Sequence, residues 1–200
     1  MNTKIDKYPP GDFGIWLIIY IELITFGGLF LGYAFTRSKD VELFNNSQDL
    51  LNQNFGLVNT VLLLTSSYFV VKAVHFVKNG LSTKKSSKYL LFAIALGIGF
   101  LLLKALEFFV KYNEGISIGT NTFFMFYYIL TIFHFLHVLL GIVILFITYK
   151  NMKKNKYTSN NCIGLETSAS YWHMVDLLWI IWCMPKLIFL KALFNINEKK

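Results

Sequence analysis

Long apolar runs separated by short polar stretches make up most of this 200-residue chain. Runs of this length predict helices that cross a membrane, because about 20 residues at a rise of 1.5 Å each span the ~30 Å hydrocarbon core of a bilayer. They lack the alternating pattern of barrel strands, and lipid offers no partner to a bare backbone donor or acceptor. The pattern predicts an all-α membrane protein, a single-domain bundle (1–200) of five transmembrane helices at about 12–35, 56–78, 88–112, 121–149 and 168–194.

Composition supports a membrane protein. Apolar residues make up 55% of the chain and aromatic residues 18%, and the mean hydropathy is +0.51, which is more apolar than soluble domains are. The first run follows Pro9 and Pro10, is too long for a signal-peptide core, and lacks a small-residue cleavage site, so we expect it to be retained. Cys162 and Cys183 show no ligand-like spacing, and we expect no disulfide.

Lysine placement predicts the orientation of the bundle. Lysines concentrate in the N-terminal tail and in the connections after the second and fourth spans. The positive-inside rule then places the N-terminus in the cytoplasm and the C-terminus outside. The net charge of +8 is divided among short loops beside lipid headgroups, so we expect membrane lipids and no nucleic acid as partners.

The connection 38–54 is the only one long enough for structure of its own. Apolar residues among acidic and amide ones would allow a short surface helix on the outer face of the bundle. A plain exposed loop is the alternative. The apolar residues of this connection are Val41, Leu43, Phe44, Leu50 and Leu51.

A few polar residues interrupt the spans, and Glu22 lies near the middle of the first. A carboxyl group at that depth either takes a partner or keeps its proton. Two interpretations follow, a neutral carboxyl hydrogen-bonded to a neighbouring helix and a proton-handling group. In the third span, Lys104 and Glu107 are three residues apart and predict an ion pair within the helix.

The histidines are the next candidates for binding a metal ion or haem. His134 and His137 share a helix face in the fourth span, but a metal site needs further ligands, and the remaining candidates lie on separate helices: Glu22, His75 and His173. Bis-histidine haem ligation would require a paired pattern that the four histidines do not show. We therefore expect no metal or cofactor in this chain.

Polar residues also gather at the predicted cytoplasmic end. His75 closes the second span, Glu166 precedes the fifth, and His173 and Asp176 open the fifth one turn apart. Similar depth predicts a hydrogen-bonded network in which His173 pairs with Asp176, whereas ordinary helix capping is the alternative. No nucleophile with a base and an orienting group is present, so we expect no catalytic residue.

Several of these pieces, taken in order, resemble subunit III of haem-copper oxidases and cover nearly the whole chain. The pieces are Glu22, NTVLLLTSS at 59–67, EFF at 107–109, NTFF at 121–124, FHFLHVLLG at 133–141, Glu166, YWHMVD at 171–176 and Trp179. The family's longer members have seven helices, with a lipid-filled cleft between the first two and the other five. This chain resembles only those five, its first span corresponding by Glu22 to the family's third. The segments 121–127, 133–137 and 171–176 are most similar to the branch associated with nitric oxide reductases.

The resemblance implies a non-catalytic subunit III of a respiratory terminal oxidase or related nitric oxide reductase complex in the bacterial cytoplasmic (inner) membrane. Such a subunit supports assembly, stability and proton or gas access. It implies a haem-bearing catalytic subunit I as partner, with or without a subunit II. Haem and any copper belong to those partners, and a phospholipid is a candidate ligand here. The alternative is an independent proton channel or transporter that uses Glu22 and the membrane histidines.

Overall fold

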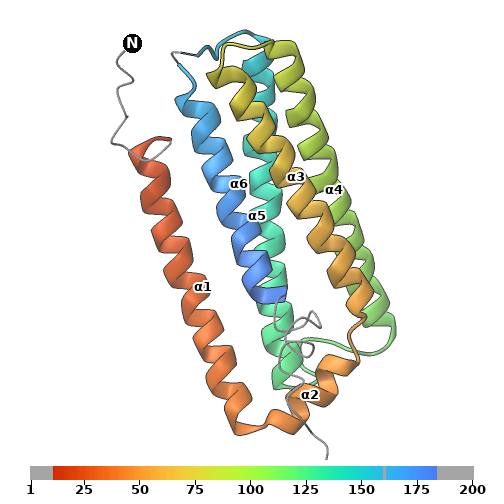
Figure 1. The fold of residues 1–200 in the computed structure, drawn as a ribbon. Helices are drawn as coiled ribbons and strands as arrows, with labels where there is room; N and C mark the ends of the chain where they lie inside the picture. The colour runs from red at the N-terminus through yellow and green to blue at the C-terminus, as the bar shows by residue number, and fades with distance from the viewer. Residues whose placement is uncertain (1–10, 160, 184–200) are drawn as a thin grey trace, which may run out of the picture.

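The computed structural model describes residues 11–159 and 161–183, which form six α-helices. The long helices run side by side, and the short α2 lies across one end of the bundle (Figure 1). We call this end the α2 end and the opposite end, where α1 begins, the far end. The helices are α1 (Phe13–Lys39), α2 (Val41–Asp49), α3 (Gln53–Lys78), α4 (Thr83–Asn113), α5 (Thr122–Lys153) and α6 (Ile163–Cys183).

The all-α prediction is confirmed. Four helices, α1, α3, α4 and α5, are long and apolar enough to cross a membrane, which makes the chain a multi-pass membrane protein. α6 contains the first part of the predicted span 168–194, and residues 184–194 lie outside the described residues. The fifth crossing and the orientation of the termini stay predictions.

The helices extend beyond the apolar runs that predicted them. α4 begins at Thr83 instead of 88, α5 continues to Lys153 instead of 149, and α6 begins at Ile163 instead of 168. Lysines explain the extension of α5, because the ammonium groups of Lys150 and Lys153 lie 4.6 Å and 5.0 Å from the ring centroids of Phe146 and Tyr149. A long cationic side chain can cover an aromatic ring and still reach the polar interface.

α2 is the surface helix that the connection 38–54 allowed. The Asp40 carboxylate caps it by accepting a hydrogen bond from the backbone N–H of Leu43 at 3.1 Å. Phe44 turns inward against the rings of Tyr33 and Phe123, with centroids 5.4 Å and 5.6 Å away. Phe44 therefore holds α2 against α1 and α5 at this end of the bundle.

Trp172 of α6 packs against a glycine of α4 and a glycine of α5 in the core. A Cβ atom at Gly97 or Gly141 would come within 2.8 Å or 2.9 Å of its indole ring. Trp172 is fully buried. By contrast, a Cβ atom at Gly28 of α1 would meet no atom within 4 Å. The two glycines beside Trp172 are required by packing, because only their missing side chains leave room for the ring.

Replacing Gly141 by alanine should therefore destabilise the protein relative to the matched Gly28→Ala change. Both substitutions gain the helix propensity of alanine, worth up to ~1 kcal/mol, but only Gly141→Ala forces Trp172 to move, at a cost of about 1–3 kcal/mol. Thermal unfolding in detergent measures the difference. Equal stability of the two variants would contradict the close contact.

Candidate functional site

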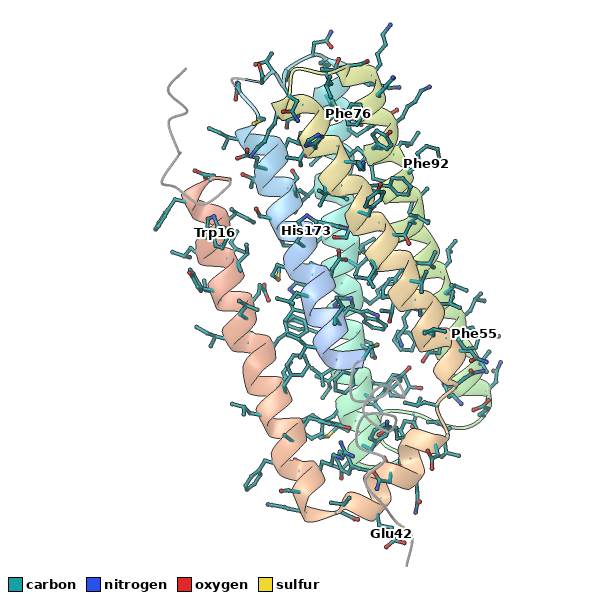
Figure 2. All side chains as sticks on the ribbon, viewed as in Figure 1. Trp16, Glu42, Phe55, Phe76, Phe92 and His173 are labelled. Atoms are coloured by element: carbon teal, nitrogen blue, oxygen red, sulfur yellow. The ribbon has the colours of Figure 1, made fainter. Side chains whose placement is uncertain are left out.

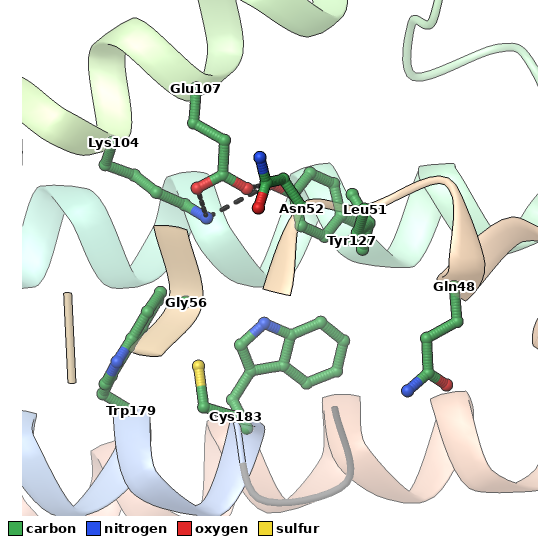
Figure 3. A pocket seen from close by; sticks show the side chains of 10 residues that line it. Gln48, Leu51, Asn52, Gly56, Lys104, Glu107, Tyr127, Trp179 and Cys183 are labelled. Carbon is green, nitrogen blue, oxygen red and sulfur yellow. Dashed lines mark hydrogen bonds and ion pairs between the residues drawn. The ribbon is translucent and has the colours of Figure 1, made fainter. Parts of the chain in front are cut away.

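The first buried polar group, the lysine cluster, consists of Lys104, Glu107 and Tyr127 near the α2 end (Figure 3). The Lys104 ammonium donates to Glu107 Oε2 at 3.0 Å and to the Tyr127 hydroxyl oxygen at 3.1 Å. The Tyr127 hydroxyl in turn donates to the other Glu107 oxygen. The structure thus brings the predicted ion pair together and adds a phenol from α5 that the sequence analysis missed. A tyrosine in an aromatic-rich span gives no signal of such a role.

Aromatic rings complete the surroundings of the Lys104 ammonium. It lies 5.4 Å, 5.0 Å and 5.2 Å from the ring centroids of Phe108, Tyr127 and Trp179, distances at which a ring face attracts a cation. A cavity of about 40 Å³ adjoins the cluster, bounded in part by Asn52 and Gly56. That volume is enough for one water molecule. The charge is compensated inside the bundle, which is what a structural ion pair needs.

Glu22 and His137 form the second group, between α1 and α5. Glu22 Oε2 lies 3.0 Å from His137 Nε2, while His137 Nδ1 lies 2.7 Å from the carbonyl oxygen of Phe133. A carbonyl can only accept, so Nδ1 carries a proton. Nε2 then either accepts from a neutral Glu22 carboxyl or donates to its carboxylate. In both states one proton lies between the two side chains.

His134 does not join His137 in one site. It points toward α4 and α6, where its ring contacts Phe100 and Trp179 at centroid distances of 5.7 Å and 4.9 Å. Neither ring nitrogen has a hydrogen-bond partner among the described residues. The predicted shared face is therefore split between two interfaces. In the described part of the chain, no three histidine, cysteine or acidic residues gather closely enough to hold a metal ion.

A groove of about 330 Å³ between α3 and α6 forms the third group, at the far end. Four of the residues that line it are polar and titratable: His75, Lys78, Glu166 and His173. The structure brings His75, Glu166 and His173 to one groove and adds Lys78, but in the described part of the chain the side-chain bonds of the three predicted residues go to other residues and form no network among them. His75 lies at the exposed rim, with its ring nitrogens 3.1–3.2 Å from the Asn79 amide.

Glu166 joins three segments at this end. Its carboxylate accepts from the Lys78 ammonium of α3 at 2.6 Å and from the backbone N–H of Gly11, just before α1, at 3.2 Å. The Cys162 thiol donates to it at 3.4 Å. Burial raises the pKa of Glu166, but the hydrogen bonds from Lys78, Cys162 and Gly11 outweigh burial and hold that pKa below its ordinary value. The Glu166 carboxylate of α6 therefore links α3 to the segment that precedes α1.

The predicted pairing of His173 with Asp176 is wrong. His173 Nδ1 instead lies 2.6 Å from the hydroxyl oxygen of Ser67 on α3, which meets its hydrogen-bonding need across the helix interface. Asp176 is 4% exposed, and neither of its oxygens has a hydrogen-bond partner among the described residues. The Ser67 side chain also lies beside Asp176. A serine within an apolar span carries no distinctive signal, so the sequence did not indicate Ser67.

Comparison with known proteins agrees with the family resemblance. A family model described as cytochrome c oxidase subunit III matches residues 11–189. The cytochrome c oxidase subunit 3 of Rhinoceros unicornis is 31% identical over 174 residues, which cover 84% of this chain and 65% of that protein. The Synechocystis protein of the same name is 30% identical over 170 residues, covering 84% and 71%. The chain thus spans about two thirds of the length of these relatives.

Replacing Lys104 by methionine should destabilise the protein by roughly 3–5 kcal/mol, because it leaves the Glu107 carboxylate buried without its cation. The double variant Lys104→Met/Glu107→Leu should lose less, since it removes both charges. Thermal unfolding in detergent compares the variants, with Lys72→Met on α3 as the control, a half-buried lysine whose ammonium lies over the Tyr68 ring. A double variant no more stable than Lys104→Met would argue against a compensated ion pair.

Replacing Lys78 by alanine should destabilise the protein at neutral pH, with a loss that fades in acid. A carboxyl whose pKa is lowered by folding contributes stability above its unfolded pKa, ordinarily 4.5, and loses that contribution as the pH falls through the folded value. Unfolding of Lys78→Ala and of the control Lys72→Ala should therefore differ at neutral pH and converge once the pH falls below the lowered folded pKa of Glu166. A difference that is independent of pH would exclude Glu166 as the source.

Proposed function

The chain belongs to the cytochrome c oxidase subunit III family, and on that premise we propose that it is a non-catalytic integral subunit of a haem-copper respiratory oxidase. The observation that carries the proposal is the family match over residues 11–189, together with relatives named cytochrome c oxidase subunit 3 in animals and a cyanobacterium. The arrangement of buried charges supports it. Lys104 and Glu107 neutralise each other, and Glu166 holds helices together, which are structural roles.

The proposed topology is the five-helix form with a cytoplasmic N-terminus, in the inner membrane of a bacterium. The apolar sequence of α6 continues past its described end to 194, and α6 runs alongside α3 and α5 (Figure 1), which supports a fifth crossing. Lysines in the tail and in the two far-end connections support the orientation. The Synechocystis relative supports a bacterial setting.

The proposed partners are a haem-bearing subunit I and, where the complex has one, a subunit II. Haem and copper belong to these partners, and this chain supports their assembly, stability and proton or gas access. Similarity of the segments 121–127, 133–137 and 171–176 supports the branch associated with nitric oxide reductases. An apolar groove of about 550 Å³ at the α2 end, lined by Phe30, Trp182 and Arg37 among others, supports a bound phospholipid with its phosphate at Arg37.

Purification of the tagged chain from its native membranes in mild detergent should recover a haem-containing subunit, visible in the absorption spectrum. After dissociation in a harsher detergent, the isolated chain should be colourless. A tagged, unrelated multi-pass protein from the same membranes is the control for carry-over.

The competing function, an independent proton channel, predicts the opposite outcome of this purification. The chain would then purify alone, and reconstituted vesicles would leak protons at a rate that Glu22→Gln abolishes. Either a haem spectrum intrinsic to the isolated chain or a Glu22-dependent leak would overturn the proposed function.

A further inference from the structure

Asp176 is a buried carboxyl on α6 that, like the His134 ring, has no hydrogen-bond partner among the described residues. It is 4% exposed, and both carboxyl oxygens lack a hydrogen-bond partner among the described residues. A carboxylate in such a place would be an uncompensated buried charge, whereas a protonated carboxyl costs far less. Its neighbour on the same face, Trp179, does find a partner, donating from Nε1 to the Thr60 hydroxyl at 3.2 Å. The neutral, protonated carboxyl is therefore the less costly form of Asp176 at this position. A proton that reaches it must come from outside the bundle.

The structure contains a route for this proton from the far-end groove. His173, on α6 (Figure 2), lines the groove and is only partly buried. Its Nδ1 lies 2.6 Å from the Ser67 hydroxyl oxygen, and the Ser67 side chain lies beside Asp176. Imidazole and hydroxyl groups each accept a proton at one position and donate one from another. The three side chains thus lie in series between an open groove and a buried carboxyl, joined by a hydrogen bond from His173 to Ser67 and by the proximity of Ser67 to Asp176.

We propose that His173 and Ser67 form a proton relay between the groove and Asp176, which makes Asp176 a reversible proton-binding site inside the bundle. During uptake, hydronium in the groove gives a proton to His173 Nε2, Nδ1 gives its proton to Ser67 Oγ, and Ser67 gives its hydroxyl proton to the Asp176 carboxylate. One proton enters and one carboxylate is neutralised. Release runs the same steps in reverse and restores the original imidazole tautomer.

Neighbouring charged groups leave this series intact. In the groove, His75 and Lys78 of α3 and Glu166 of α6 face His173, and Lys78 is bound to Glu166 at 2.6 Å. On the inner side, His134 of α5 packs against Trp179, three residues after Asp176, and Lys104 of α4 is bound to Glu107. Glu22 of α1 is bound to His137. The inference is independent of the proposed function, because it concerns proton exchange within this chain alone.

Infrared spectroscopy of the purified full-length chain tests the proposal. The carbonyl stretch of a protonated carboxyl should disappear in Asp176→Asn, with Glu22→Gln as a common background that removes the other candidate carboxyl. On transfer to D₂O, this band should shift quickly in the parent chain. Ser67→Ala and His173→Gln should slow the shift on the order of 10²-fold, the contribution that a positioned proton-transfer group makes.

Two matched changes separate a relay from a packing effect. Ser66→Ala removes a buried hydroxyl that donates to the Ala93 carbonyl instead, and Ser67→Thr keeps a hydroxyl in place; both should exchange at the parent rate. Should Ser67→Ala fail to fold, His173→Gln decides, because its amide can bond to Ser67 without relaying protons. A slowing of less than about tenfold relative to Ser66→Ala, or an Asp176→Asn spectrum that loses no band, overturns the proposal.

Discussion

The contact of Trp172 with Gly97 and Gly141 determines how α6 sits in the bundle. The ring fills the space left by two missing side chains, so α4, α5 and α6 meet at one depth and in one rotation. Side chains one and two helical turns further along must then face the same interior. This places Asp176 beside Ser67 and brings Trp179 to Thr60 and His134. The positions of the buried polar groups on α6 therefore follow from a packing requirement.

Buried polar side chains are accommodated in two ways, by ion pairing and by carboxyl groups that hold or share a proton. Lys104 and Glu107 form an ion pair, and a phenol and three ring faces complete the surroundings of the ammonium. Glu22 and His137 share a proton between two helices, and Asp176 lies where only a neutral carboxyl is inexpensive. Both solutions keep uncompensated charge away from lipid, as a spanning helix requires. They leave the surface of the bundle apolar, suited to lipid or to the partner subunits proposed above.

Hydropathy was sufficient to predict the helical class and the positions of the long helices, because membrane spans are set by length and apolarity alone. It missed the polar extensions of α4, α5 and α6, since lysines and serines continue a helix beyond the apolar core. Within one helix, spacing predicted the contact of Lys104 with Glu107. Contacts between helices depend on rotation about each axis, which one sequence does not reveal. For this reason Ser67 was missed, His173 was paired with the wrong partner, and His134 and His137 were assigned to one face.

The packing of α1 has a consequence for the order in which the protein is made. α1 is the first of the described helices to be synthesised, yet it packs against α5 and α6, the last two. Gly11 binds a residue 155 positions later, and Glu22 binds His137. Until α5 has emerged from the ribosome, Glu22 lies in an apolar segment without this partner, where a neutral carboxyl is the inexpensive form. The first helix therefore stays in the membrane without its later partners, and the contact between Glu22 and His137 forms only once α5 has been made.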